Sequence, residues 1–333
     1  MKVIVDPSCN ILYSSYYLYG LKQYFGKQMS FAAHPFKSLP FSFEHLALVI
    51  QDEHQVYKII IDFNNRKAIS QEHLTWCDVY GKVNLAPEDQ VIPKVVPIGP
   101  LTAIQLYDYP TTVWKAAMNY LKSWKKIKGI KTIKTFLIYY KYQLSRPRFE
   151  KYQPKQPKKN YAFFAASLWK KEAEANQLRA NFIKACQQTQ ELEFEGGFAP
   201  RTKRDIKGFE QLTMPQKVTY DEFYQKTEAS TFVFNTPTVQ GCNGWRLAEY
   251  LAMGKAIIST PLVRLVPKEL IDEKHVLFVS GSQDSIQQAI QKLLNDQELR
   301  HNLSKNTISY FQEYLAPQKV IEQLIDRVKQ IGN

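Results

Sequence analysis

The sequence predicts an α/β protein made of two domains. The chain has 333 residues, which is the length of about two ordinary domains. Short apolar segments of strand type alternate with segments of helical periodicity along both halves. Polar residues cluster where several predicted strands end, as they do at the ligand-binding edge of an open α/β sheet.

A change in composition divides the chain. Residues 1–150 form the first predicted domain and residues 151–315 the second, with a Lys- and Pro-rich linker at 146–160. Residues 316–333 predict a terminal helix that could pack back on the first domain.

The first half predicts a sheet flanked by helices. Apolar spacing predicts a helix at 11–25, and Gly26 supplies its stop. The segments 45–50 and 56–61 flank a polar turn, so they predict either a hairpin or two parallel strands. Residues 114–134 predict one strongly basic helix. The predicted strands are 3–5, 31–36, 45–50, 56–61, 77–83 and 91–98.

The second half repeats the alternation of strands and helices. Its predicted strands begin at 161 and then cover 192–198, 231–234, 256–258 and 276–279. Its predicted helices are 174–187, 220–228, a short one from 245, 285–294, 296–311 and the terminal one from 317.

The stretch 235–260 carries the most informative pattern in the chain. A strand ends near Asn235, a loop containing Gly241 and Gly244 follows, and a helix then begins at Trp245 and stops at Gly254. The first N–H groups of a helix lack intrahelical partners and lie at the positive end of its dipole. The pattern therefore predicts a site for phosphate oxygens.

Two charged side chains accompany this helix start. Arg246 lies in the first turn, and Glu249 lies about one turn later, so both can serve one ligand. A carboxylate at that place suits a pair of sugar hydroxyls. The alternative is a surface ion pair, which contributes about 0.3–0.5 kcal/mol. Lys170 and Lys171 follow the first strand of this half and predict either phosphate contacts or a solvated helix start.

The formal net charge of +13 predicts an anionic partner: nucleic acid, anionic lipid or a phosphorylated substrate. Lysines and tryptophans in residues 114–134 suit lipid headgroups, nucleic-acid phosphates or a solvated helix face. The sequence contains no zinc-finger, RNP-like or helix-turn-helix signature, and no nucleic-acid partner is expected.

The four cysteines form no CxxC pair and read as reduced thiols of a cytosolic protein. The first residues read as a core strand and not as a signal peptide. No apolar run approaches the roughly 20 residues that span a bilayer. We expect a cytoplasmic protein that can lie peripherally on the inner face of the cytoplasmic membrane.

Residues 160–315 resemble the nucleotide-binding domain of GT-B glycosyltransferases, closest to the branch that builds bacterial surface polysaccharides. The resemblance rests on GWRLAEYLAMGKAIIST and on the later LLNDQELRHNLSKN. It implies two Rossmann-like domains facing each other across a cleft. It also implies transfer of a sugar from a nucleotide-sugar to a saccharide acceptor, expected to be carried on a lipid, in the synthesis of capsule, O-antigen or another surface glycan.

The resemblance implies roles for residues of the second half. Glu249 would hold the ribose hydroxyls, and Arg246 would hold the diphosphate together with the backbone of the two residues before the helix. The other implied donor-side residues are Asn243 and Gly244 in that backbone, Thr236, Pro237 and Thr238 at the sugar, and residues 218–220 with Tyr220 at the base. Lys170 stays a candidate for phosphate.

Two positions depart from the family pattern. Gly241 stands where retaining enzymes carry the first of two glutamates, and Ala166-Ser167 stand where the family has Gly-Arg. Inversion and retention therefore both stay open. The sequence contains no Asp-x-Asp motif, so we expect neither a metal nor another cofactor, with cations and the helix dipole offsetting the leaving-group charge.

An inverting reaction needs a general base near the acceptor hydroxyl, and the first half would supply it. Asp78 is the favoured candidate, with Lys82 nearby, followed by Asp62, Asp6 and His34. Each has the alternative of a structural role at a strand end. Two other function classes stay open: a non-catalytic protein that binds sugar-nucleotides or polyanions, and a nucleic-acid-binding protein.

Overall fold

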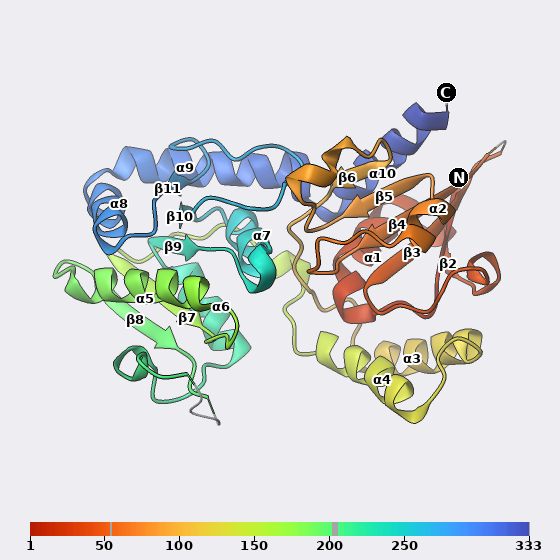
Figure 1. The fold of residues 1–333 in the computed structure, drawn as a ribbon, viewed down its shortest axis with the longest axis horizontal. Coiled ribbons are helices and arrows are strands. Elements are labelled where there is room, and N and C mark those ends of the chain that lie inside the picture. Colours follow the sequence, from red (N-terminus) through yellow and green to blue (C-terminus); the bar gives the residue numbers. More distant parts are fainter. Residues whose placement is uncertain (54, 202–205, 333) are drawn as a thin grey trace. The chain divides into compact units, whose positions relative to one another are not determined.

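The computed structural model describes residues 1–53, 55–201 and 206–332, and Figure 1 shows the elements within its two compact units. Unit 1 comprises Met1–Lys151, Leu265–Pro267 and Glu313–Asn333, and unit 2 comprises Tyr152–Arg264 and Lys268–Gln312. The change of unit after Lys151 lies next to the predicted boundary at 150. Both units alternate strands with helices, so the predicted α/β class is confirmed.

Unit 1 contains a six-stranded sheet in the order β2-β1-β3-β4-β5-β6. β3 and β4 form an antiparallel hairpin, and every other strand runs parallel to β1 and β4. The carboxyl ends of β1, β4, β5 and β6 therefore lie at the same edge as the amino end of β3. The strands are β1 (Lys2–Val5), β2 (Met29–Phe31), β3 (His45–Gln51), β4 (Val56–Asp62), β5 (Val79–Lys82) and β6 (Val95–Pro97).

Helices pack on this sheet and on one another. Asn10 caps α1 (Ile11–Phe25) by accepting hydrogen bonds from the first-turn N–H groups of Leu12 and Tyr13. The last helix, α10 (Pro317–Gly332), lies against α1 and β5. The remaining helices of unit 1 are α2 (Gln71–Trp76), α3 (Tyr109–Ser123) and α4 (Ile130–Gln143).

Two predictions for unit 1 are corrected. The strand predicted at 31–36 ends at Phe31, and His34–Phe36 form a 3₁₀ turn, since Pro35 supplies no backbone N–H for a sheet. The single basic helix predicted at 114–134 is two helices, because the chain turns at 124–129. Gly129, which has a φ of 82°, begins the second helix.

Unit 2 contains five parallel strands in two ladders, β7-β8 and β9-β10-β11. The ladders meet where the Thr231 N–H, just before β9, donates to the carbonyl of Tyr161 in β7 at 2.7 Å. All five carboxyl ends therefore point the same way. The strands are β7 (Tyr161–Ala166), β8 (Glu193–Phe198), β9 (Phe232–Asn235), β10 (Ala256–Ser259) and β11 (Leu277–Phe278).

The helices of unit 2 connect and cover these strands. Aromatic rings hold them in place: Phe182 of the first helix stacks on Phe234 of β9, with the ring centroids 4.4 Å apart. The helices are α5 (Ala173–Gln188), α6 (Tyr220–Ala229), α7 (Trp245–Ala252), α8 (Gln283–Asn295) and α9 (Gln297–Tyr310).

Gly20 allows α1 and α10 to approach closely. A Cβ at this position would lie 2.2 Å from the carbonyl oxygen of Pro317, which is backbone and cannot rotate away. We expect Gly20→Ala to lower the free energy of unfolding of unit 1 by up to about 2 kcal/mol. The cost of forcing the helices apart, about 1–3 kcal/mol, exceeds the gain of about 1 kcal/mol from alanine's helix propensity.

Urea titration followed by circular dichroism measures this change. Gln23→Ala on the exposed side of α1 is the matched control, and we expect it to leave the stability of unit 1 nearly unchanged. Equal or greater stability of Gly20→Ala would contradict the close packing of the two helices.

Candidate functional site

The amino end of α7 lies at the carboxyl edge of unit 2. The helix follows β9 after a loop, and its N-cap is Gly244, whose backbone is extended and whose position offers no side chain to bond the first-turn N–H groups. The Leu247 N–H donates to the carbonyl of Gly244 at 3.1 Å, so it is the positive end of the helix dipole that favours an anion here. This geometry agrees with the phosphate site that the sequence predicts.

The loop before α7 requires glycine at two positions. A Cβ on Gly244 would lie 2.8 Å from Thr238 Cγ2. Gly241 has a φ of 72°, and a Cβ there would lie 2.7 Å from Val263 Cγ2. The loop is thus pressed against its own unit, so its backbone is held in place beside the helix start.

Glu249 is almost completely buried, with 3% of its surface exposed. Its Oε1 accepts a hydrogen bond from the Tyr220 hydroxyl at 2.7 Å and one from the Tyr152 hydroxyl at 3.3 Å. The alternative of a surface ion pair with Arg246 is therefore wrong for this carboxylate. The structure does bring together two predicted site residues, Glu249 and Tyr220. Sequence reasoning missed Tyr152, because it lies in the segment interpreted as a linker.

The sequence predicts one buried face for this helix, whereas all six residues from Leu247 to Ala252 are buried. Trp245, assigned to the buried face, is only half-buried. The helix is thus enclosed by its own unit except near its amino end.

Arg246 projects from the first turn of α7 over aromatic rings. Its guanidinium carbon lies 4.8 Å from the ring centroid of Phe223 and 5.7 Å from that of Phe164. A second arginine, Arg179 of α5, is buried nearby, and its pKa falls to about 10 because of burial and the charge of Arg246. Two cations close enough to disfavour one another raise the positive potential at this edge.

Further cations follow neighbouring strands of unit 2. Lys170, a predicted site residue, is exposed in the turn after β7. Arg201 follows β8 and donates to the carbonyl of Leu168 at 2.7 Å. Arg264 follows β10, is 4% exposed, and donates to the carbonyl of Gln240 in the loop before α7 at 2.8 Å. Sequence reasoning missed both arginines, although each comes shortly after a predicted strand.

Three other predicted residues brace the loop. The Thr238 hydroxyl donates to the carbonyl of Cys242 at 3.1 Å, and Asn243 Nδ2 donates to the carbonyl of Arg264 at 3.3 Å. Thr236 is buried, and its hydroxyl bonds that of Thr260 at 3.3 Å. Their side chains thus hold the backbone in shape, and the donor-sugar role given to Thr236 and Thr238 stays a prediction.

Unit 1 gathers polar side chains at its own carboxyl edge. Asp62, at the end of β4, is 1% exposed. Its Oδ2 accepts hydrogen bonds from the Tyr80 hydroxyl at 2.6 Å and from Lys82 Nζ at 2.8 Å, and its Oδ1 accepts from the Asn64 N–H at 2.7 Å. Such a carboxylate is committed to the fold, so the geometry gives its predicted role as a general base no support.

Two histidines extend this network. His45 at the start of β3 and His73 of α2 stack with their ring centroids 3.9 Å apart. His45 Nε2 lies 3.2 Å from the Tyr80 hydroxyl, and because that hydroxyl donates its hydrogen to Asp62, His45 is the donor. Burial lowers the pKa of His45 to about 4 and also lowers the pKa of His73, so both rings are neutral at pH 7.

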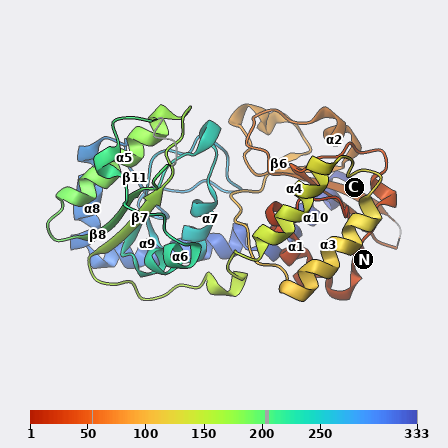
Figure 2. The same cartoon turned by 90° about the horizontal axis from the view of Figure 1, so that it is seen from below.

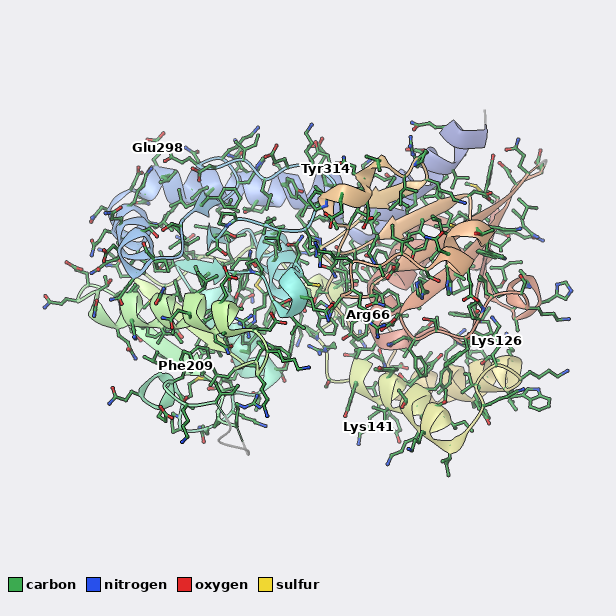
Figure 3. The ribbon with its side chains drawn as sticks, viewed as in Figure 1. Arg66, Lys126, Lys141, Phe209, Glu298 and Tyr314 are labelled. Atoms are coloured by element: carbon green, nitrogen blue, oxygen red, sulfur yellow. The ribbon has the colours of Figure 1, made fainter. Side chains whose placement is uncertain are left out.

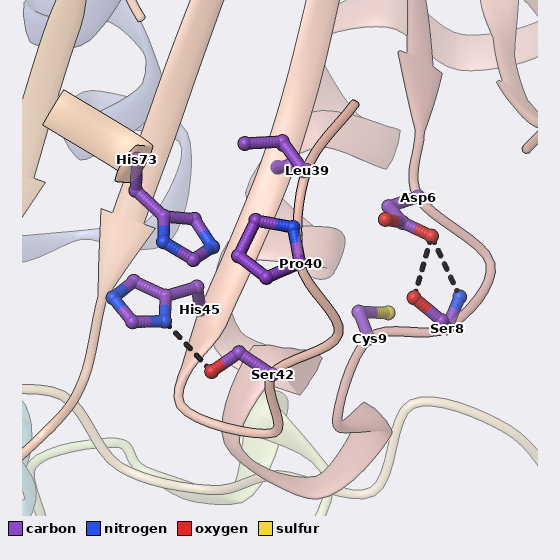
Figure 4. Close-up of a pocket in the computed structure, with 9 residues that line it drawn as sticks. Asp6, Ser8, Cys9, Leu39, Pro40, Ser42, His45 and His73 are labelled. Atoms are coloured by element: carbon purple, nitrogen blue, oxygen red, sulfur yellow. Dashed lines mark hydrogen bonds between the residues drawn. The ribbon is translucent and has the colours of Figure 1, made fainter. Parts of the chain in front are cut away.

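Figure 4 shows the small pocket that these histidines line together with Asp6 and Ser8 after β1. Asp6 Oδ1 accepts from the Ser8 N–H and hydroxyl, and Asp6 Oδ2 accepts from Lys126 Nζ at 3.0 Å. Cys9 also lines the pocket, and burial raises the pKa of its thiol, which therefore stays protonated. Sequence reasoning missed both histidines. The antiparallel direction of β3 brings His45 to this edge, and His73 comes from the short helix α2.

The other two base candidates lie elsewhere in unit 1. Asp78 precedes β5, at the amino end of that strand, and its Oδ2 accepts a hydrogen bond from the backbone N–H of Lys58 at 2.7 Å. This is the structural role that the sequence offers as its alternative. His34 is exposed in the turn after β2. Catalytic roles for Asp78 and His34 stay predictions.

A family model described as "Glycosyl transferases group 1" matches residues 209–310. No curated protein matches the chain. The C-terminal domain of the glycosyl transferase group 1 family protein LpcC from Francisella tularensis is similar, with 14% identity over 49% of this chain and 95% of that chain and a TM-score of 0.33.

Two longer structures are also similar. MnaA of S. aureus, solved with UDP, has 15% identity over 78% of this chain, which spans 61% of that chain, and a TM-score of 0.38. HepE of Anabaena, solved with UDP and glucose, has 10% identity over 77% of this chain and 78% of that chain, and a TM-score of 0.40. Because the identities and TM-scores of these structures are low, the likeness to glycosyltransferases depends on the family match of residues 209–310 alone.

The lowered pKa of His45 predicts a pH dependence of stability. The ordinary histidine pKa is about 6.5, so the unfolded chain takes up a proton before the native His45 does. The free energy of unfolding should therefore fall as the pH falls from about 6.5 towards 4, by up to about 3 kcal/mol.

Urea titrations of unit 1 at pH 7 and pH 4.5 measure this loss. His45→Gln should reduce it, whereas His301→Gln at an exposed position of α9 should leave it unchanged. An equal loss in wild type and His45→Gln would show that other groups cause the pH dependence.

Proposed function

We propose that the protein transfers a sugar from a nucleoside-diphosphate sugar to a saccharide acceptor, because residues 209–310 match the model of the glycosyl transferases group 1 family. This match confirms the enzyme class predicted from the sequence, a glycosyltransferase. The donor and the acceptor are the parts that we propose.

One observation carries the donor proposal: the amino end of α7 has no side-chain cap and lies at the edge where all strands of unit 2 end. In parallel α/β sheets, ligands bind outside this edge, at the point where neighbouring strands connect to opposite sides. β7 connects to β8 on one side and lies beside β9 on the other, so this point is next to α7. We assign the diphosphate to the N–H groups of the helix start.

The side chains around this point support a doubly charged ligand. Arg246 contributes a cation in the first turn, with Lys170 and Arg264 as further cations of the same edge. Glu249 supplies the acceptor oxygens that ribose hydroxyls require, in a carboxylate whose position is held by the hydroxyls of Tyr152 and Tyr220. Tyr220 itself presents a ring against which a base could stack.

This charge arrangement also bears on catalysis. When the bond between the sugar and the diphosphate breaks, negative charge develops on the leaving phosphate. Fixed arginines and oriented backbone N–H groups stabilise such charge without reorganising. We therefore propose that the reaction needs no metal ion and no other cofactor.

We assign acceptor recognition to the carboxyl edge of unit 1. The pocket lined by Asp6, Ser8, His45 and His73 has a volume of about 10 Å³, so it offers its hydrogen-bonding groups to a single hydroxyl and not to a whole sugar. His73 is neutral at pH 7 and its Nδ1 bonds the Ser70 hydroxyl at 2.8 Å, which fixes its ring. We assign the general base to this ring, because the other neutral histidine, His45, bonds the Tyr80 hydroxyl through its Nε2.

We further propose that the acceptor is carried on a lipid and that the enzyme acts at the inner face of the cytoplasmic membrane, in the synthesis of a bacterial surface glycan. No helix in the described part of the chain is long and apolar enough to cross a bilayer. A lipid-linked acceptor would therefore be reached from the membrane surface.

Nucleotide binding tests the donor site. We expect UDP or GDP to bind the wild type, and Arg246→Gln to weaken binding of the diphosphate about tenfold while changing that of the nucleoside little, since only the diphosphate loses a charge-assisted contact. Glu249→Gln should instead weaken the nucleoside and the diphosphate alike. Isothermal titration calorimetry measures both. Glu222→Gln, at a half-exposed position of α6, is the matched control.

No binding of any nucleoside diphosphate by the wild type would contradict the donor site. Equal losses of diphosphate and nucleoside affinity in Arg246→Gln would contradict the role given to the arginine.

Transfer itself requires a separate measurement. With a panel of nucleotide-sugars and membrane lipid extract as acceptor, we expect release of nucleoside diphosphate that continues unchanged in EDTA, because the fixed cations replace a metal. Loss of activity in EDTA would contradict metal independence. Nucleotide binding without any transfer or donor hydrolysis would favour the alternative of a non-catalytic sugar-nucleotide-binding protein.

A further inference from the structure

The helices α3 and α4 lie side by side on unit 1, and Figure 2 shows both with no other element in front of them. The buried side of α3 carries only small and polar residues, whereas α4 buries Phe136 and Tyr140 together with Gln143. Asn119 Nδ2 of α3 donates to the Tyr140 hydroxyl of α4 at 2.9 Å, and Gln143 at the end of α4 accepts from the backbone N–H of Leu106 at 2.8 Å. Hydrogen bonds thus join the two helices to each other and α4 to the chain before α3, and Tyr139 packs α4 against the rings of Tyr13 and Phe43.

Large apolar side chains are concentrated on the outer sides of these helices. Of the 14 exposed large hydrophobic residues of the described chain, eight lie within residues 109–143. Their exposed fractions include 57% for Trp114, 63% for Leu121 and 84% for Ile130. Single exposed hydrophobic residues are ordinary, but a contiguous group marks an interaction surface. The eight residues are Tyr109, Val113, Trp114, Leu121, Trp124, Ile130, Leu137 and Tyr142.

On α3 the exposed apolar residues follow helical spacing. Val113, Ala117 and Leu121 succeed one another at intervals of four, with Trp114 and Trp124 beside them. The helix therefore has a buried polar side and an exposed apolar side, the reverse of a helix that covers a protein core. On α4 an apolar groove lies at the surface, lined by Ile130, Ile133, Lys134, Leu137, Ile138 and Lys141.

The charge of this region has one sign. Residues 109–143 contain eight lysines and no aspartate, glutamate or arginine, which accounts for +8 of the net charge of +13. Lys126 pairs with Asp6, and Figure 3 labels it together with Lys141 of α4. The pKa of Lys115 is lowered by burial and by the charges of Lys122 and Lys22, so these amines crowd one another.

We infer that the outer faces of α3 and α4 form a docking surface for an anionic lipid bilayer. Exposed Trp and aliphatic side chains enter the boundary between headgroups and acyl chains, and lysines reach the lipid phosphates beside them. This inference deepens the proposal of a lipid-linked acceptor, but it depends only on α3 and α4 and can fail or hold without sugar transfer.

The same features argue against two other occupants. A nucleic acid binds mainly through contacts between cations and its phosphates, and an exposed aliphatic side chain such as Ile130 would contribute little to that binding. A second copy of this chain would bring two strongly basic surfaces together. Only a bilayer surface combines negative charge with an apolar interior.

Vesicle flotation tests the surface directly. We expect the wild type to bind vesicles of phosphatidylglycerol and phosphatidylcholine at low salt, to bind phosphatidylcholine alone much more weakly, and to release the anionic vesicles as salt increases. The triple variant Lys125→Gln/Lys128→Gln/Lys131→Gln should lower the partition coefficient about a hundredfold, at about fivefold per lysine.

A matched triple variant separates position from total charge. Lys268→Gln/Lys274→Gln/Lys305→Gln removes the same charge from exposed lysines of unit 2 and should leave vesicle binding within about twofold of wild type, since these lysines lie outside the docking surface. Equal losses in the two triple variants would overturn the inference, because net charge alone would then explain binding.

The apolar contribution has its own variant. Trp114→Ala/Leu121→Ala/Trp124→Ala keeps every lysine and should weaken binding at least tenfold, with Trp169→Ala in unit 2 as the control. Nucleoside diphosphate binding and the circular dichroism spectrum should be unchanged in all of these variants. The inference would be overturned if the wild type did not bind anionic vesicles, or if it bound oligonucleotides at concentrations where it did not bind vesicles.

Discussion

The direction of the strands is the constraint on which the rest of this protein depends. In each unit, parallel strands bring the starts of successive connections to one edge of the sheet. Residues that are far apart in the chain, such as Asp6, Asp62 and Lys82, thereby become neighbours at one edge of unit 1. The same constraint in unit 2 brings the loop before α7 together with the arginines that follow β8 and β10. The chemistry of both edges is therefore a consequence of strand direction.

Each of the two sheet edges contains a buried carboxylate, and the two carboxylates are stabilised by different kinds of partner. Asp62 is matched by the ammonium group of Lys82, itself fully buried, so the pair is balanced inside the fold. Glu249 receives hydrogen bonds from two tyrosine hydroxyls, which are neutral donors. The charge of Asp62 is therefore neutralised within the fold, whereas neutral hydroxyls hold Glu249 without neutralising its charge.

Local sequence patterns predicted much of this fold. Features that depend on contacts between distant parts of the chain were not predicted. The bounds of α1 and the start of α7 follow from adjacent residues, namely Gly26 and Gly244. The orientation of β3 does not, because an apolar run reads the same in parallel and antiparallel sheets. His45 was missed for this reason. The turn within residues 124–129 was missed because lysines are compatible with a continuous helix. Tyr152 reaches Glu249 across 97 residues, a contact that no local pattern encodes.

The close approach of α10 to α1 has a consequence for the order in which the protein can form. Unit 1 starts with the first residues of the chain, yet α10 is made after the whole of unit 2. During synthesis, the apolar surface of α1 and β5 that α10 covers therefore stays uncovered until α10 has been made. Unit 2, which precedes α10 in the sequence, can complete its core before unit 1 does.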